Sequence, residues 1–523
     1  MAWQAYQKQF ETRKMDESHF VLGIDLGNAM SSIAYFDVLR QAPEVIDMSG
    51  GYGKPSAPTV LQFSPDTQEW VFGEYAVLNQ GLGNEQIFRG LLERLGKNES
   101  VEVNGEEMSA AHILGLYCKE LVAMCKSLNP KAEIAGIVAA VPSDMNAATQ
   151  ADYLAAFREA GMADDLIALV PDRECILHRH YSDGLAAPEK VLLLDFGSRA
   201  LRGGIYDVRL DADGIAVDCV SSLFDETIGV EQVNARVQEW FTDFYCEQAQ
   251  IAKDALTKQT LAQLSVFAYQ NKDLLFRKAI GAKPIKLYYN FAYPPMQQTV
   301  SAADVQAVIA PFAEAFAGFL KDVFAKTLRV DDALRAGDIQ TVLCTGGGFE
   351  MLWARAFVQE AFRDSKVVFF KNAKGVTAEG ASLMAAVRMG VIPPRSVRLT
   401  DRHMLAADIG VQVQRWQEAQ FVPLAERFSF WWQRRDPVQF LLNEPTGGRE
   451  TAIELFRREA DGTVRPIASA LLDGLPERPA GTTKLAVSLQ FDAYDKLRIA
   501  VKDVGFGELF PKTEFEKIFL VQI

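Results

Sequence analysis

The chain of 523 residues is longer than one typical hydrophobic core, so two or three domains are expected. A formal net charge of −14, with no run of clustered Lys and Arg, argues against nucleic acid or a membrane surface as a partner. Six scattered cysteines without a Cys-x-x-Cys pair, no apolar block near the N-terminus and no uncharged stretch of membrane-spanning length predict a cytoplasmic protein.

The first predicted element is a β-hairpin, VLGIDLGNAMSSIAYFDV over residues 21–38, which follows an N-terminal extension over residues 1–19. Its first strand is apolar and ends at the corner Asp25-Leu26-Gly27. Apolar strands and amphipathic helices then alternate, which is typical of a sheet with helices packed on its faces. These predicted elements lie at residues 57–63, 73–80, 106–128, 134–142 and 147–161.

A second hairpin, VLLLDFGSRALRGGIYDV over residues 191–208, repeats the first at an offset of 170 residues. Its corner is Asp195-Phe196-Gly197, and it carries Arg199 where the first hairpin has a small residue. Two matched hairpins indicate an internal duplication of one supersecondary unit. The elements that follow are helices at 229–246, 254–278 and 301–327, a strand at 341–344, the glycines Gly346, Gly347 and Gly348, and a helix at 351–362.

The sequence changes character near residue 393. Residues 393–403 carry paired prolines and charges and predict an exposed linker. A strand is predicted at 450–459, and alternating apolar residues over 484–501 predict a hairpin with one buried face. Residues 404–523 are therefore expected to form an all-β sandwich domain. Its aromatic cluster is a candidate for either a peptide groove or the strand core, and it consists of Phe428, Phe430, Trp431 and Trp432.

The two Asp-x-Gly corners have residue types suited to a nucleotide. Glycine lets backbone N–H groups approach an anion closely, and an aspartate at a strand end can hold a hydrated divalent cation or orient a water. Two such corners facing each other would hold a triphosphate and its Mg²⁺ between them. The alternative for each corner is an ordinary turn.

The order of these elements resembles the actin-like ATPase fold, and specifically a divergent, lidless member of the seventy-kilodalton heat-shock chaperone family, over residues 20–523. The resemblance implies an α/β actin-like ATPase domain of two duplicated halves over residues 20–392, followed by the all-β sandwich. The stretches that carry it are GIDLGNAMSSIAYF, LLLDFGSRALRGGIYDV, IQTVLCTGGGFEMLWARAFVQEAF and TAEGASLMAAVRMGVI.

The resemblance implies ATP or ADP and Mg²⁺ as ligands. Asp25 and Asp195 would hold the hydrated metal as catalytic residues, with Asp195 orienting the attacking water. A solvated lysine is the alternative for Lys272. The implied phosphate-loop residues are Gly27, Asn28, Gly197 and Ser198, and those near the nucleoside are Gly229, Lys272, Gly346, Gly347 and Gly348. The all-β domain would bind a polypeptide, and a nucleotide-exchange or co-chaperone partner is expected.

Several positions depart from the family pattern. Asn28 and Ala29 stand where the family has two threonines, and Gly-Ser-Arg-Ala at residues 197–200 replaces Gly-Gly-Gly-Thr. Residues 393–403 lack the family's apolar-acidic linker. The closest match to the family's catalytic-lysine segment, IFRGLLERLGK, has leucine at the lysine position, with Arg89 or Arg94 nearby. The glutamate of the family's Asn-Glu-Pro-Thr segment maps ambiguously onto PDREC, where either Asp172 or Glu174 would substitute.

Three functional hypotheses follow. The first is a chaperone-like protein that binds ATP with Mg²⁺ and a polypeptide, with slow or lost hydrolysis. The second is a pseudo-ATPase scaffold or adaptor without turnover, because the altered glycines and the missing lysine remove phosphate contacts and transition-state stabilisation. Arg199 could turn inward and restore charge, or point outward into solvent. The third, a small-molecule kinase of the same fold, would not need a terminal β-domain.

Overall fold

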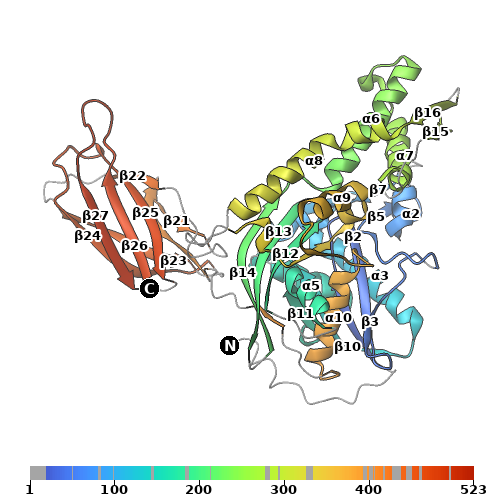
Figure 1. Cartoon of the computed structure of the whole chain (residues 1–523), viewed down its shortest axis with the longest axis horizontal. Coiled ribbons are helices and arrows are strands. Elements are labelled where there is room, and N and C mark those ends of the chain that lie inside the picture. The colour runs from blue at the N-terminus through green and yellow to red at the C-terminus, as the bar shows by residue number, and fades with distance from the viewer. Residues whose placement is uncertain are drawn as a thin grey trace. The chain divides into compact units, whose positions relative to one another are not determined.

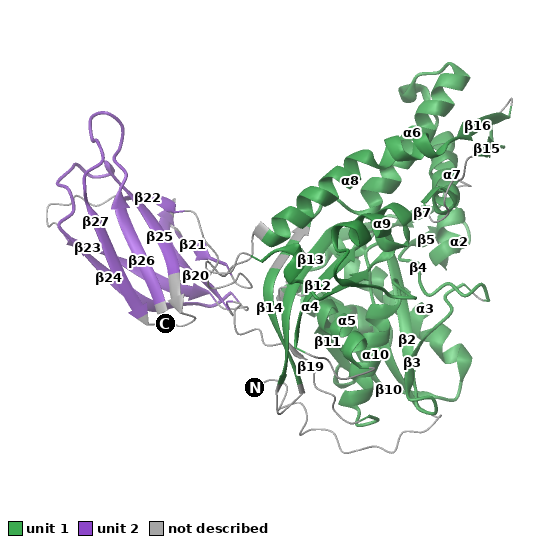
Figure 2. Cartoon of the chain, in the orientation of Figure 1, with its two compact units in different colours: residues 1–327, 332–399 green, residues 328–331, 400–523 purple. Residues whose placement is uncertain are grey.

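A computed structural model gives the arrangement of the chain, which Figure 1 shows from the N- to the C-terminus. Figure 2 divides it into two compact units, residues 1–327 with 332–399 and residues 328–331 with 400–523. The structure describes residues 19–49, 51–79, 84–97, 99–142, 147–182, 188–211, 214–276, 283–292, 295–325, 334–392, 397–399, 405, 407–415, 418–426, 437–442, 450–458, 462–493 and 496–522.

The first half of the larger unit is built on a sheet in the order β11-β10-β1-β2-β3, with β4 paired to β2. The hairpin β1–β2 is antiparallel, as the sequence predicts, whereas β10 and β11 run parallel to β1. Alternate residues of β1 pack into two different cores, which explains its continuous apolar run. The strands are β1 (His19–Asp25), β2 (Met30–Asp37), β3 (Ala42–Val45), β4 (Ala57–Pro58), β10 (Glu133–Val141) and β11 (Ile167–Pro171).

The second half contains a sheet in the order β18-β17-β12-β13-β14-β19. Its hairpin β12–β13 is also antiparallel, as predicted, and β17 and β18 run parallel to β12. Its first five strands therefore follow the order and directions of β11-β10-β1-β2-β3. The strands are β12 (Glu189–Phe196), β13 (Leu201–Asp211), β14 (Gly214–Asp225), β17 (Thr341–Thr345), β18 (Lys366–Phe369) and β19 (Val397–Leu399).

Helices pack against both sheets (Figure 1). The predicted helix over 106–128 begins only at Ala110, because residues 106–109 pair with a preceding strand and Ser109 caps the helix through the N–H of His112. No helix within the described ranges is long and apolar enough to cross a membrane. The helices are α2 (Gly73–Leu78), α3 (Ala110–Leu128), α4 (Ala147–Glu159), α5 (Asp172–Tyr181), α6 (Val230–Ala249), α7 (Lys258–Phe276), α8 (Ala302–Ala325), α9 (Leu352–Ala361) and α10 (Val376–Arg388).

Helix α10 joins the two halves. It follows β18 of the second sheet, yet it packs on β1 and α5 of the first half. A Cβ on Gly23 would lie 2.1 Å from the backbone nitrogen of Ser382, and a Cβ on Gly380 would lie 1.8 Å from the carbonyl oxygen of Cys175. Glycine at both positions therefore permits backbone contact of α10 with a strand and with a helix.

The predicted linker over residues 393–403 needs correction. Residues 397–399 form β19, which pairs in parallel with Ile215 to Val217 of β14 and so extends the second sheet. This pairing supplies hydrogen bonds to the edge of β14, so these residues form a strand and not part of a connector. The other residues of the predicted linker, and the predicted N-terminal extension up to residue 18, lie outside the described residues.

The smaller unit contains two antiparallel four-stranded sheets, β21-β20-β23-β24 and β22-β25-β26-β27, which share one apolar core. The hairpin predicted over 484–501 is confirmed as β25–β26, and the strand predicted over 450–459 is confirmed as β23. Phe428, Phe430, Trp431 and Trp432 lie outside the described residues. The strands are β20 (Asp408–Arg415), β21 (Glu418–Ala425), β22 (Val438–Leu442), β23 (Glu450–Arg458), β24 (Val464–Asp473), β25 (Thr483–Ala493), β26 (Lys496–Asp503) and β27 (Glu516–Gln522).

Candidate functional site

Asp25 and Asp195 lie at the carboxyl ends of the two central strands β1 and β12. Asp25 lies beside Ala140 of the parallel strand β10, and Asp195 lies beside Thr345 of the parallel strand β17. Both residues are partly exposed, while the four residues before each of them are buried. The charge of Asp195 raises the pKa of Asp25, so the structure places these two predicted site residues within electrostatic range of each other.

A third carboxylate, Asp172, belongs to the same group. It is the first residue of α5 and directly follows β11, which lies two strands, or about 10 Å, from β1. It interacts electrostatically with both Asp25 and Asp195. Of the two residues that the sequence offers for the family's glutamate, Asp172 is thus placed with the predicted aspartates. We term Asp25, Asp172 and Asp195 the carboxylate cluster.

Arg202 reaches into the carboxylate cluster from β13. It is the direct cross-strand neighbour of Asp195, and its Nη1 donates to Oδ2 of Asp172 at 3.1 Å. It also interacts electrostatically with Asp25. Because the side chain of Arg202 is 48% exposed, this pair is not a buried structural salt bridge. The arginine connects the second sheet to α5 of the first half.

The surroundings raise the pKa of the two central aspartates unequally. For Asp25, desolvation contributes most, Asp172 and Asp195 add to it and Arg202 opposes it, so that the pKa rises to about 8. For Asp195, desolvation raises the pKa, Arg202 lowers it and Asp172 raises it, which brings it to about 6. Near neutral pH the cluster therefore holds a largely protonated Asp25 beside a largely ionised Asp195.

Asp25→Asn is expected to stabilise the protein by about 3.5 kcal/mol more at pH 8 than at pH 5. An unfolded aspartate releases its proton near pH 4, whereas folded Asp25 keeps it to about pH 8, so the wild type loses stability as pH rises between these values. Asparagine does not titrate and removes this loss. Thermal unfolding from pH 5 to pH 8 measures the effect, with Asp66→Asn at an exposed position as control; a pH-independent difference would contradict the assignment.

The glycine run after β17 packs against the second corner. Gly346 has a φ of +88°, and a Cβ there would lie 2.5 Å from Oδ1 of Asp195. A Cβ on Gly348 would lie 2.1 Å from the ring of Phe196, while Gly347 lies close to a lysine side chain of a neighbouring loop. The run therefore places backbone directly against the carboxylate of Asp195.

The second loop is hydrogen-bonded to the start of α6. The N–H of Gly197 donates within its own turn at 3.0 Å, and the Gly197 carbonyl accepts from the N–H of Val230 at 3.0 Å. The carbonyl of Ser198 accepts from the N–H of Glu231 at 2.8 Å. A Cβ on Gly229 would lie 2.5 Å from the Ser198 carbonyl oxygen. The N–H groups of Gly197, Val230 and Glu231 are thus used within the protein and are not available to an anion.

The first loop is held from two sides. Oγ1 of Thr59 donates to the carbonyl oxygen of Gly27 at 2.7 Å. Nδ2 of Asn28 donates to Oε1 of Glu93 at 2.8 Å, in the short 3₁₀ turn Leu91–Arg94. Oδ1 of Asn28 is buried and has no hydrogen-bond partner among the described residues. Asn28 therefore retains capacity for a ligand donor.

Arg199 forms ion pairs with two glutamates. Its Nη2 donates to Glu226, and its Nε lies 3.9 Å from Oε1 of Glu93. The same Oε1 accepts from Asn28, so Glu93 connects the tips of the two loops. We term Asn28, Glu93, Arg199 and Glu226 the loop bridge. The half-exposed Arg199 thus adopts an arrangement between the two expected ones, neither at the aspartates nor free in solvent.

Lys272 lies on α7, with its Nζ 4.6 Å from the ring centroid of Tyr269. The hydroxyl of Tyr269 donates to Oε2 of Glu74 on α2, at 2.9 Å, and so links the two halves. Desolvation lowers the pKa of the Arg89 guanidinium, while the charges of Tyr269 and Glu231 raise it by less. Arg89 thus lies within electrostatic range of the tyrosine that links the two halves. A role of Lys272 near a nucleoside stays a prediction.

The described residues do not fit a divalent cation at the carboxylate cluster. No three His, Cys, Asp or Glu side chains of the described part of the chain are arranged closely enough to hold a metal ion. The guanidinium of Arg202 also brings a fixed positive charge to the carboxylates. That Asp25 and Asp195 hold Mg²⁺ therefore stays a prediction that this arrangement does not favour.

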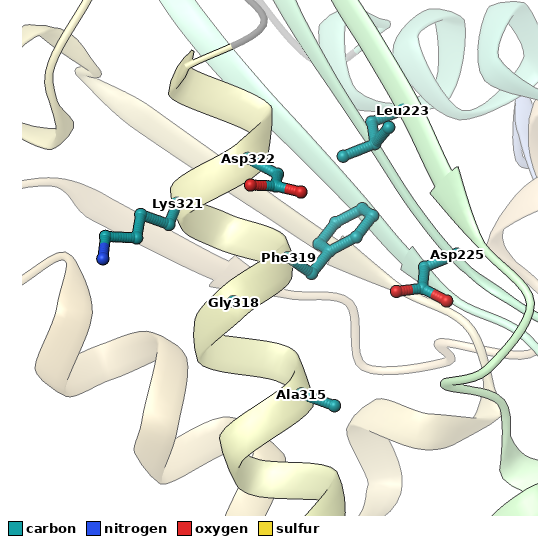
Figure 3. Close-up of a pocket in the computed structure, with 7 residues that line it drawn as sticks. All are labelled: Leu223, Asp225, Ala315, Gly318, Phe319, Lys321 and Asp322. Atoms are coloured by element: carbon teal, nitrogen blue, oxygen red, sulfur yellow. The ribbon is translucent and has the colours of Figure 1, made fainter.

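The pocket drawn in Figure 3 lies away from the carboxylate cluster. It occupies about 320 Å³ between α8 and the end of β14. Asp225 in its wall accepts hydrogen bonds from Thr227, as a turn-capping residue does. The pocket shares no lining residue with the cluster and adds nothing to the site. Its lining residues are Leu223, Asp225, Ala315, Gly318, Phe319, Lys321 and Asp322.

Arg202 and Glu93 were not among the residues predicted for the site. The signal for Arg202 is present in the sequence, because alignment of the two hairpins gives Arg202 the position that Ser32 has in the first hairpin. Ser32 is buried and donates to a backbone carbonyl, so the hairpin itself does not require a long cation there. No local pattern identifies Glu93, whose partners are 65 and 106 residues away, at Asn28 and Arg199.

Two family models match parts of the chain. Residues 42–202 match the C-terminal part of a family of unknown function (DUF5716). Residues 404–519 match a domain of unknown function (DUF8552), which corresponds to the all-β unit. The first match contains Asp172 and Asp195 and ends at Arg202, so it contains the ion pair of Arg202 but not Asp25.

Proposed function

We propose that residues 20–392 form a divergent actin-like domain, related to the seventy-kilodalton heat-shock chaperones, that binds ATP or ADP and hydrolyses ATP slowly or not at all. One observation carries the proposal: Asp25 and Asp195, from two hairpins of the same kind, lie at the carboxyl ends of central strands in two sheets with matching strand order and interact electrostatically. Carboxyl ends of strands in open α/β sheets are where such folds bind ligands. The close approach of Gly346 to Asp195 supports the same place.

The arrangement of the loops favours binding without turnover, as in a pseudo-ATPase scaffold. The loop bridge occupies Asn28 and Arg199 with glutamates, whose negative charge disfavours a polyphosphate. Donors at the start of α6 are bonded to the second loop. Transition-state stabilisation in phosphoryl transfer depends on such positive charges and backbone donors, so few of them remain for catalysis.

The C-terminal unit is proposed to bind a polypeptide in the cytoplasm, with an exchange factor or co-chaperone as a further partner of the protein. Large apolar side chains are exposed on this unit, and Ile518 and Leu520 lie two residues apart on β27, an edge strand. Exposed apolar groups on an edge strand suit an extended peptide. An all-β unit also disfavours a small-molecule kinase. The exposed residues are Leu441, Leu471, Phe506, Leu509, Ile518 and Leu520.

Titration calorimetry with ATP and ADP tests the nucleotide proposal. Wild type is expected to bind both, and Gly346→Ala to bind at least about tenfold more weakly, because its Cβ would displace the Asp195 carboxylate. Gly161→Ala is the matched control, since Gly161 also has a positive φ, +82°, but nothing lies within 4 Å of its Cβ position. Absence of binding heat in wild type would refute the proposal. Rapid single-turnover hydrolysis would instead support an active ATPase.

A further inference from the structure

We propose that Arg202 takes the place of the divalent cation, so that the carboxylate cluster excludes Mg²⁺ and the proposed nucleotide site binds its nucleotide without metal. The exclusion of metal concerns this chain's own residues, whereas metal-free nucleotide binding rests on the function proposed above. The two parts are therefore tested separately.

The position of Arg202 is that of a counter-ion shared by the cluster. It stands directly across the strand pair from Asp195, donates to Asp172 at 3.1 Å and interacts with the charge of Asp25. A guanidinium remains charged at all physiological pH values, so this positive charge is permanent. A divalent cation that entered the cluster would meet it at close range and be repelled.

The internal repeat indicates that this arginine is not needed to build the hairpin. Ser32 is the cross-strand partner of Asp25, as Arg202 is of Asp195. Ser32 is 1% exposed and its Oγ donates to the carbonyl oxygen of Lys374 at 3.1 Å. The same corner therefore folds with a small polar residue in one copy and with an exposed, cluster-facing arginine in the other.

A structural role alone would predict something different. If Arg202 only tied α5 to the second sheet through Asp172, its removal would lower stability and leave metal binding unchanged. If Arg202 replaces a cation, its removal leaves three carboxylates without their positive charge. These carboxylates do not form a metal site as they stand, but without Arg202 a cation that prefers oxygen ligands would draw them together. Metal binding, measured apart from stability, distinguishes the two roles.

The first experiment titrates Mn²⁺ into the nucleotide-free full-length protein and counts bound ions by electron paramagnetic resonance. Wild type is expected to show no saturable site. Arg202→Ser is expected to bind one Mn²⁺ with an affinity at least about tenfold above any weak binding by wild type. Arg40→Ser is the matched control, because Arg40 is an exposed arginine in the turn between β2 and β3 that pairs with Asp37 and Glu44. Arg202→Lys, which keeps the charge, is expected to behave as wild type.

Adding Asp172→Asn to Arg202→Ser is expected to abolish the new site and so locate it at the cluster. A wild-type Mn²⁺ site that Asp172→Asn removes would overturn the proposal, and this result needs no arginine variant to fold. Equal Mn²⁺ binding by folded wild type and Arg202→Ser, judged by circular dichroism, would overturn it as well.

The second experiment compares ATP and ADP binding in EDTA and in Mg²⁺ by calorimetry. The Kd of wild type is expected to differ by no more than about threefold between the two buffers. The Kd of Arg202→Ser is expected to be at least about tenfold lower in Mg²⁺ than in EDTA. Wild-type binding that requires Mg²⁺ would overturn this inference while leaving the proposed nucleotide binding intact. Failure of wild type to bind in either buffer would overturn the proposed function, and the Mn²⁺ titration would still decide the role of Arg202.

Discussion

Replacing Arg478 by methionine is expected to destabilise the C-terminal unit by about 3 kcal/mol, the lower end of the range for breaking a buried ion pair. Arg478 makes two hydrogen bonds to Asp503, at 3.0 and 2.7 Å, and the side chains are 6% and 0% exposed. Methionine fills similar space but leaves the Asp503 carboxylate buried without its guanidinium. The remaining donors from Gly505 and Thr513 limit the loss.

Urea titration of the full chain, followed by hydrogen exchange in β25 and β26, measures this loss in the unit concerned. Lys517→Met is the control, because the pair of Lys517 with Asp473 is exposed and its removal should cost less than about 1 kcal/mol. A loss of equal size in both variants would contradict the importance of burial.

The same pair predicts the acid sensitivity of the C-terminal unit. Desolvation raises the pKa of Asp503, but hydrogen bonds from Arg478, Gly505 and Thr513 lower it by more, so the net shift is downward. A lowered folded pKa means that the stabilisation is complete above the unfolded value near 4 and is lost as pH falls through the folded pKa. The unit should therefore unfold more readily below pH 4 in wild type, with a smaller slope in Asp503→Asn.

The regular part of the fold could be predicted because its signals are local. Apolar runs that end in Asp-x-Gly placed both hairpins at β1–β2 and β12–β13, and strict alternation placed β25–β26. Misplaced boundaries had tertiary causes. Residues 397–399 stand among the prolines and charges that predict a linker, but they pair with the open edge of β14 and form β19. Residues 106–109 join a short hairpin before the cap of α3.

The candidate site could be predicted only in part. Asp25 and Asp195 were found because each ends a strand of a repeated motif, so position and residue type are both local. The alignment of the two hairpins marks Arg202, but not its partner Asp172. That pair and the contacts of Glu93 depend on which side chains meet across the two halves, and composition and periodicity do not contain that information. Arg199 illustrates the limit: its unusual place was evident in the sequence, but its partners Glu93 and Glu226 were not.

Phe196→Ala is expected to destabilise the larger unit by about 3–5 kcal/mol and to weaken any ligand binding at Asp195. The ring of Phe196 is fully buried, with centroids 5.8 to 6.0 Å from those of three other aromatic rings, and it packs against Gly348. Alanine would leave a cavity directly beneath the Asp195 corner, so both the packing and the placement of the carboxylate would be lost. The three rings belong to Phe316, Phe349 and Trp353.

Phe196→Leu separates these two effects, because Leu26 occupies the same place in the first corner and is also buried. The loss of stability in Phe196→Leu should be smaller, about 1–1.5 kcal/mol, since leucine keeps most of the apolar volume. Calorimetric unfolding measures both variants, and Leu352→Ala, at a position 40% exposed, should change stability by no more than about 0.5 kcal/mol. If Phe196→Ala lowered stability no more than Leu352→Ala, the packing of Phe196 among the three neighbouring rings would not be what holds Asp195 in place. A larger loss of stability in Phe196→Ala than in Phe196→Leu would mean that the second corner depends on the packing of this side chain.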